Sequence, residues 1–152
     1  MSASLLTESD LAARVGTPFP GGEVRLERWW VHLALDSVGA HPDDGPGHPA
    51  LVFLIATGSM GWSWSDLFDL FSASEDDGPM AGETATTVHQ PLRIGPTYRV
   101  AGEIISARRK EGRSVGVFDI VEYRLDILGD DDTVQASTTN SIIFPRRGGV
   151  AA

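Results

Sequence analysis

The sequence contains no cysteine, so disulfide bonds, thiolate nucleophiles and cysteine-ligated zinc sites are all excluded. It also lacks a long apolar run: the longest, residues 50–56, is far shorter than the roughly 20 residues that a membrane-spanning helix needs. The first four residues, Met-Ser-Ala-Ser, have neither the positive charge nor the apolar stretch of a signal peptide. These absences predict a cytoplasmic protein.

Positive charge is scarce as well, because 12 Lys and Arg residues stand against 21 Asp and Glu residues, for a formal net charge of −9. A surface this negative repels the phosphate backbone of nucleic acids and the headgroups of anionic lipids. The charge balance therefore argues against nucleic-acid binding and against adsorption to a membrane surface.

With 152 residues, 41% of them hydrophobic, the chain is long enough to bury a core. We expect a single domain over residues 1–152, frayed at residues 1–6 and 146–152 as chain ends often are. No H-E-x-x-H, P-loop or G-x-G-x-x-G pattern occurs. The loop that holds His41 and Asp44 is too rich in Gly and Pro to fix metal ligands, so we expect no metal ion.

The N-terminal half predicts helices and loops around one short strand. Hydrophobic periodicity places a helix capped by Thr7 and ended by Gly16, a strand over residues 23–27, a helix over 28–38, an irregular loop over 40–49 and a short helix over 65–71 capped by Ser65. Residues 50–60 are apolar throughout and allow either a buried helix or a buried strand.

The C-terminal half predicts an antiparallel meander. Alternating residues place strands over 84–89, 98–108, 117–128 and 134–144, with hairpin connections at 109–113 and 129–132. Pattern alone therefore favours an α+β domain whose antiparallel sheet packs on helices from the first half.

One segment of the sequence resembles a motif of a known protein family. From His89 the sequence reads His-Gln-Pro-Leu-Arg-Ile-Gly-Pro-Thr, which resembles the H-x-P-L-x-x-G-D-T hairpin of the MaoC-like hydroxyacyl-thioester dehydratases, with Pro96 in place of the usual Asp. The resemblance runs from about residue 15 to 147. It implies the hot-dog fold, a curved antiparallel sheet wrapped around a central helix drawn from residues 50–71. It also implies action on coenzyme A or acyl-carrier-protein thioesters in fatty acid or polyketide metabolism.

Catalytic members of this family resemble one another in a loop of the form F-A-x-x-x-G-D-x-N-P-x-H, whose Asp and His move protons. When residues 33–34 and Pro42 are matched to that frame, Gly39 stands at the Asp position and Asp44 at the His position. A shift by one residue only brings Ala40 to the Asp position. Gly and Ala cannot move a proton, so the resemblance implies the N-terminal, non-catalytic type of hot-dog domain.

Two histidines could replace the missing pair. His41, oriented by Asp36 or Asp44, could act as a general base near neutral pH. The simpler interpretation is a solvent-exposed loop histidine. His89 could line a pocket, although a half-buried histidine hydrogen-bonded to the backbone is the more common case.

Two other groups could bind substrate. Arg108, Arg109, Lys110 and Arg113 gather four of the chain's 12 positive charges on one hairpin, where they could bind the phosphates of coenzyme A or phosphopantetheine. Alternatively, they form a solvated hairpin tip. Trp62 and Trp64 could form the wall of an acyl pocket, or they could fill the core and an interface.

The sequence therefore predicts a subunit of an enoyl-thioester hydratase or 3-hydroxyacyl-thioester dehydratase, paired with a catalytic MaoC-like subunit that supplies Asp and His. One alternative is a non-enzymatic thioester-binding scaffold. Another is a homodimeric hot-dog enzyme, a hydrolase or a biosynthetic tailoring enzyme, that uses His41 or His89. We expect a homodimer or a heterodimer with a second hot-dog subunit. No cofactor is expected beyond the coenzyme A or phosphopantetheine of the substrate.

Overall fold

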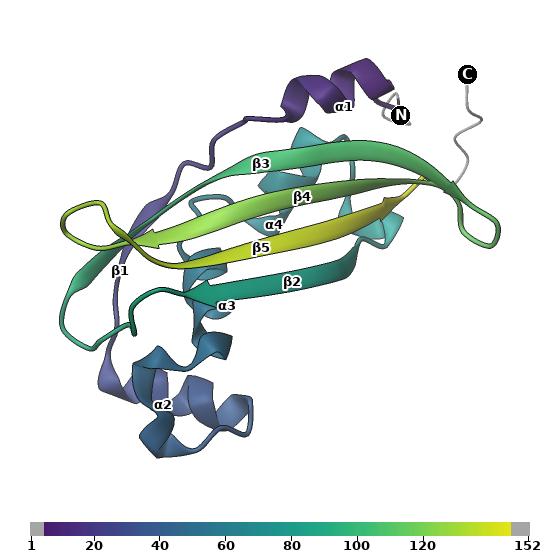
Figure 1. Ribbon diagram of the computed structural model, residues 1–152. Coiled ribbons are helices and arrows are strands. Elements are labelled where there is room, and N and C mark those ends of the chain that lie inside the picture. The colour runs from purple at the N-terminus through teal and green to yellow at the C-terminus, as the bar shows by residue number, and fades with distance from the viewer. Residues whose placement is uncertain (1–4, 147–152) are drawn as a thin grey trace.

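One antiparallel sheet curves around a central helix in the computed structural model, which describes residues 5–146 (Figure 1). The strands are β1 (Gly22–Arg25), β2 (Met80–Val88), β3 (Thr97–Gly112), β4 (Gly116–Leu128) and β5 (Val134–Pro145). Their order across the sheet is β1-β3-β4-β5-β2, and every pair is antiparallel. The α+β arrangement expected from the sequence is confirmed.

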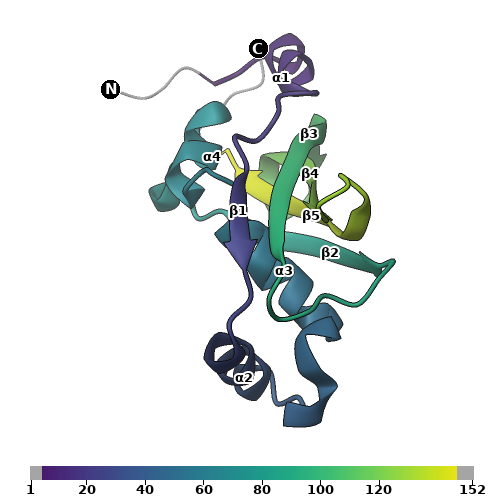
Figure 2. The ribbon, with the colours of Figure 1, turned by 90° about the vertical axis from the view of Figure 1, so that its left-hand side faces the viewer.

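The helices are α1 (Glu8–Arg14), α2 (Arg28–Ser37), α3 (Pro49–Gly58) and α4 (Trp64–Leu70), with short 3-10 turns η1 (Pro42–Gly47) and η2 (Glu75–Asp77). The ambiguous apolar segment is helix α3. Pro49 occupies its first turn, where no N–H is needed, and the Nδ1 atom of His48 accepts a hydrogen bond from the N–H of Ala50 at 3.2 Å. In Figure 2, α3 and α4 lie on the same side of the curved sheet.

The core forms where one face of the sheet meets α3 and α4. Alternate residues of the long strands point to this face, because successive side chains of a strand project to opposite sides. The sheet side of this core contains Tyr98, Val100, Ile104, Val121, Tyr123, Leu125, Ile127, Ala136, Ile142 and Phe144, and the helix side contains Leu51, Val52, Ile55, Ala56, Leu67 and Phe68. Each large side chain buried there stabilises the fold by about 1.5–3 kcal/mol.

A β-bulge in β3 decides which of its basic residues point inward. The register shifts between Ile104, opposite Tyr123, and Ser106, opposite Glu122. The bulge reverses the alternation, so Arg109 then lies opposite the buried Asp119 on the helix-facing side. Residues 108 and 110 project from the convex side.

Asp119 is fully buried and holds two arginines. Its Oδ1 accepts from Arg109 Nε at 2.8 Å, and its Oδ2 accepts from Arg146 Nε at 2.8 Å. Arg146 also donates to the carbonyl oxygens of Ser72 at 3.1 Å and Phe71 at 2.6 Å, at the C-terminal end of α4. This ion cluster joins β3, β4 and the end of β5 to α4.

The structure corrects the predicted frayed ends. Arg146 is buried in the ion cluster, and Leu6 packs against the core, so neither residue is frayed. The prediction took both residues as solvated because they lie near the chain ends. Instead, Arg146 pairs with the buried Asp119, and Leu6 packs against the hydrophobic core. Residues 1–4 and 147–152 of the predicted ends lie outside the described residues.

Several element bounds also differ from the predictions. β2 begins at Met80 rather than at residue 84, and β3 continues to Gly112, so the predicted connection at 109–113 is mostly strand. Six residues of the predicted irregular loop form η1. Ser63, not Ser65, caps α4: its hydroxyl accepts from the Asp66 N–H at 3.1 Å, and the Asp66 carboxylate accepts from the Ser63 N–H at 2.8 Å. The hydrogen bonds from Ser63 lower the pKa of Asp66.

Replacing Asp119 by Ala should lower the free energy of unfolding by about 3–5 kcal/mol, because two largely buried guanidinium groups would lose their counter-charge. Urea denaturation monitored by circular dichroism measures this change. The matched control is Glu103→Ala, which removes the exposed partner of Arg124 and should cost less than about 1 kcal/mol. Equal losses in both variants would contradict a structural role for the ion cluster.

Candidate functional site

Helix α3 has no charged residue and is apolar on all sides. One face, with Leu51, Val52, Ile55 and Ala56, is buried in the core. The opposite face presents Phe53 and Leu54, and Leu54 is 36% exposed. A helix face that meets water normally carries charged or polar residues, so this face is suited to contact with an apolar surface or ligand.

Three cavities along this face share lining residues. The first, of about 270 Å³, lies between β1, α2 and α3; the second, of about 450 Å³, lies between α2, α3 and β2; the third, of about 190 Å³, lies between α3, α4, β2 and β5. Leu54 lines the first and second cavities, and Phe53 and Thr84 line the second and third. We call this row of neighbouring cavities the α3 trough.

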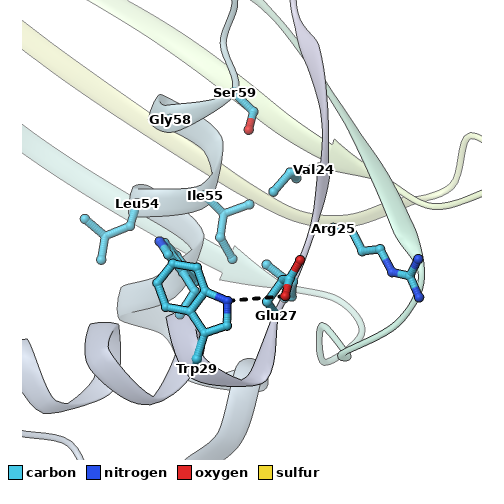
Figure 3. A pocket seen from close by; sticks show the side chains of 10 residues that line it. Val24, Arg25, Glu27, Trp29, Leu54, Ile55, Gly58 and Ser59 are labelled. Atoms are coloured by element: carbon cyan, nitrogen blue, oxygen red, sulfur yellow. Dashed lines mark hydrogen bonds between the residues drawn. The ribbon is translucent and has the colours of Figure 1, made fainter.

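The first cavity is a hydrophobic hollow beside Trp29 and Trp30. Figure 3 shows the Trp29 ring below Leu54 and Ile55, while Arg25 extends away from the cavity. The indole N–H of Trp29 donates to the Glu27 carboxylate at 3.2 Å. Trp29 is nevertheless 61% exposed, so a large aromatic surface is available at this end of the trough.

The free edge of β2 borders the trough. Among the described strands, β2 pairs only with β5, which leaves its outer row of N–H and C=O groups open. Most of its nine residues are exposed, and Glu83 is the only charged one. Native proteins usually protect such an edge with charges, proline or a covering element. An open edge beside an apolar trough is typical of a surface that pairs with another chain.

The loop that would carry the family's catalytic pair lies between α2 and α3 and has a structural arrangement instead. His41 caps η1: its Nδ1 accepts from the Asp43 N–H at 3.2 Å, and its own N–H donates to the Asp44 carboxylate at 3.0 Å. The His41 side chain is 71% exposed. Gly47 packs against Pro91, and a Cβ atom there would lie 3.1 Å from the Pro91 Cβ.

The second cavity lies beside this loop and contains no titratable group. Its lining residues are Ser37, Val38, Pro49, Ala50, Phe53, Leu54, Thr84 and Thr86. The candidates Asp36, His41 and Asp44 do not line any of the three cavities. The structure therefore brings His41 and Asp44 together through a capping interaction, not as a catalytic pair in a cavity.

His89, the other histidine candidate, is exposed and follows the end of β2. Its backbone N–H donates to the Gln135 carbonyl at 2.8 Å, as expected for a structural position, but its side chain is more exposed than predicted. It does not line any cavity of the α3 trough.

The predicted basic group of four divides into one interior residue and three exterior residues. Arg109 donates to the buried Asp119 from Nε and from Nη2, at 2.8 and 3.1 Å, so its predicted role as a phosphate ligand is contradicted. The bulge in β3 is the physical reason. Arg108, Lys110 and Arg113 remain exposed, and Arg108 lies 3.6 Å from Glu122.

The two candidate tryptophans also differ in position. Trp62 packs against Phe19, with ring centroids 4.7 Å apart, and belongs to the periphery of the core rather than to the trough. Trp64 lines the third cavity, as an acyl-pocket role requires. Tyr123 and Asn140 line the same cavity and were not selected from the sequence. Burial raises the pKa of Tyr123 far above its ordinary value, so its hydroxyl stays protonated.

Within residues 5–146, no three His, Asp or Glu side chains are close enough to hold a metal ion. None of the helices in this range has both the length and the apolar character needed to cross a membrane.

Comparison with solved structures identifies the fold. A MaoC-like dehydratase matches with a TM-score of 0.70 and 17% identity, over 90% of this chain and 44% of that chain. The ChsH1–ChsH2 complex from Mycobacterium tuberculosis matches with a TM-score of 0.63 and 17% identity, over 93% of this chain and 90% of that chain. The C-terminally truncated HadBC (3R)-hydroxyacyl-ACP dehydratase complex of the same organism matches at 0.62 and 16%, over 86% and 96%.

These structures establish the hot-dog fold, so the fold expected from the sequence resemblance is confirmed. No protein-family model matches the sequence, and no curated protein matches it. Because all three identities are low, the likeness extends to the fold and not to the chemistry.

Replacing Leu54 by Arg should prevent association of this chain with a second chain through the α3 trough, because a charge would be buried there. The interface should exceed about 2,000 Å² in total, as obligate interfaces do. Sedimentation velocity at micromolar concentration measures the association. Val115→Arg is the matched control, since Val115 is 58% exposed in the turn after β3. A wild-type monomer, or equal loss in both variants, would contradict an interface at the trough.

Proposed function

We propose that this chain is the non-catalytic subunit of a hot-dog enzyme that hydrates 2-enoyl thioesters or dehydrates 3-hydroxyacyl thioesters. The observation that carries the proposal is the second cavity, which lies beside the loop between α2 and α3 but has no titratable lining residue. Hydration requires a base that activates water and an acid that protonates the neighbouring carbon. A cavity without either group can hold an acyl chain but cannot move these protons.

The missing groups would come from a second subunit. Two of the similar structures are complexes of two subunits, ChsH1–ChsH2 and HadBC, and the latter is a hydroxyacyl-ACP dehydratase. The α3 trough and the open edge of β2 give this chain a surface of the kind that pairs with another subunit. This chain matches only 44% of the MaoC-like dehydratase, so that longer chain has room for a second domain of similar size.

In this assembly the chain contributes the wall of the acyl site. Phe53, Trp64 and Phe68 line the third cavity and would exclude water from the part of the substrate that lies there. The binding energy of this remote part of the substrate would hold the thioester in position against the partner's acid and base.

The exterior cations would contact the carrier part of the substrate. Arg108, Lys110 and Arg113 lie on an otherwise acidic protein and could bind the phosphates of coenzyme A or phosphopantetheine. The patch lies at the same end of the sheet as the third cavity, with Arg108 and Lys110 on the opposite, convex face. The row of paired residues that leads from Ala107 through Val121 to Ile142 and Ala81 ends at that cavity.

The purified chain alone should hydrate crotonyl-coenzyme A weakly or not at all. Addition of a hot-dog subunit that copurifies from the native source and carries the intact Asp and His loop should raise the rate by about 10²–10⁴-fold or more. Loss of the enoyl absorbance measures the reaction. If the chain alone were active, and His41→Ala abolished that activity without unfolding, the homodimeric enzyme hypothesis would replace this one. Binding of the thioester by a complex without any activity would favour the scaffold hypothesis.

The double charge reversal Lys110→Glu/Arg113→Glu should weaken binding of the coenzyme A thioester by about 1–3 kcal/mol, with a larger effect at low salt than at high salt. Isothermal titration calorimetry measures the affinity. Arg28→Glu/Arg93→Glu is the matched control, because it changes the net charge equally at exposed positions that line none of the three cavities. Unchanged binding at low salt, or an equal loss in the control, would reduce the patch to a contribution to solubility.

A further inference from the structure

The third cavity contains a buried amide with an unused donor. Thr138 and Asn140 lie on the helix-facing side of β5, and Asn140 is only 3% exposed. The Thr138 hydroxyl donates to the Asn140 Oδ1 atom at 3.1 Å. Within residues 5–146, the Asn140 Nδ2 atom has no hydrogen-bond partner. Buried polar groups in folded proteins are almost always paired, so this donor requires an explanation.

Asn140 belongs to a polar row that crosses an apolar cavity. Thr84 of β2 pairs with Asn140, and Asn140 pairs with Tyr123 of β4. Directly paired residues project to the same face, so these three hydrogen-bonding side chains stand side by side, and all three line the third cavity. The opposite wall is apolar and contains Phe53, Trp64 and Phe68.

The local backbone supports a ligand site at this row. The pairing of β2 with β5 shifts between Ala81 and Thr84, and the Glu83 N–H donates to the Ser141 hydroxyl at 2.7 Å instead of to the strand ladder. Such bulges are common beside functional sites, because they redirect side chains. Here the bulge brings Thr84 into register with Asn140.

The row can recognise an oxygen, and none of its three side chains is ionised near neutral pH. An amide and a threonine hydroxyl do not titrate, and the tyrosine hydroxyl stays protonated. In a purely structural polar row, buried donors are normally paired with protein groups or ordered water. The cavity volume of about 190 Å³ is below the range of complete ligand pockets, so it fits one segment of a longer molecule.

We propose that the third cavity binds a segment of an acyl chain that carries a carbonyl or hydroxyl oxygen away from the thioester, and that this oxygen accepts a hydrogen bond from Asn140 Nδ2. The substrate class is therefore an oxygenated acyl thioester, not a plain hydrocarbon one. The thioester part of this statement rests on the proposed function, whereas the selection of the oxygen does not.

Calorimetry with free fatty acids tests the selection, using the purified full-length protein in its native assembly. The probes are dodecanoic acid and a series of oxododecanoic acids that differ in the position of the oxo group. At least one isomer should bind about tenfold more tightly than dodecanoic acid, a difference of about 1.4 kcal/mol. Equal affinity for all isomers and for dodecanoic acid would overturn the proposal.

The double variant Thr138→Val/Asn140→Leu removes both members of the buried pair. It should lose the preference for the oxo isomer, keep the affinity for dodecanoic acid, and unfold at the same or a higher temperature than the wild type, since no buried donor is left unpaired. If it does not fold, Asn140→Ser should reduce the preference at least severalfold. A preference that survives in the folded variant would overturn the proposal.

Thr139→Val is the matched control, because Thr139 lies beside Asn140 on the opposite face of the sheet and should keep the full preference. An equal loss there would also contradict the assignment to Asn140. The probes contain no thioester, so oxygen selection without any partner-dependent hydratase activity would reject the proposed function alone. Hydratase activity without oxygen selection would reject this inference alone.

Discussion

The rest of the structure depends on one constraint, which is that helix α3 is apolar on both of its sides. The sheet can cover only one side of a helix, and it does so with the alternating residues of β3, β4 and β5. The other side, with Phe53 and Leu54, becomes the floor of the α3 trough. The open edge of β2, the exposed Trp29 and the cavities all border that uncovered side. One side of α3 thus packs on the concave face of the sheet, and the other side lines the α3 trough, which is the surface used in the proposed function.

The loop between α2 and α3 illustrates how the same residue types can serve the backbone instead of chemistry. The Nδ1 atoms of His41 and His48 both accept hydrogen bonds from backbone N–H groups, and so begin η1 and α3. The carboxylate of Asp44 accepts the N–H of His41. A histidine committed in this way fixes where the central helix starts. Such positions hold α3 in place over the sheet, whereas no acid or base lines the second cavity.

Much of this fold can be predicted from hydrophobic periodicity and from capping and turn residues, because alternating strands and capped helices are local properties of the sequence. The errors arise where a distant contact overrides a local pattern. In the sequence, Arg109 belongs to a basic hairpin. In the structure, a bulge at Ile105 turns its side chain toward Asp119. Such a bulge cannot be recognised from the composition of the segment. Ser65 was predicted to cap α4, whereas the reciprocal hydrogen bonds between Ser63 and Asp66 place the cap at Ser63. At the site, Trp64 was predictable as an aromatic residue near a pocket. Asn140 was not, since its orphaned donor is visible only in three dimensions.

The contact of Arg146 with the carbonyl of Phe71 has a consequence for the order of events during synthesis. It closes a loop of 75 residues between α4 and the last described residue of the chain. Helix α4 therefore cannot complete its packing until β5 and Arg146 have been translated and have left the ribosome. Until then, the nascent chain carries an uncovered apolar surface, which is the state in which chains of this size associate wrongly. The emergence of β5 and Arg146 from the ribosome, more than the propensity of any helix, would set when this apolar surface is covered.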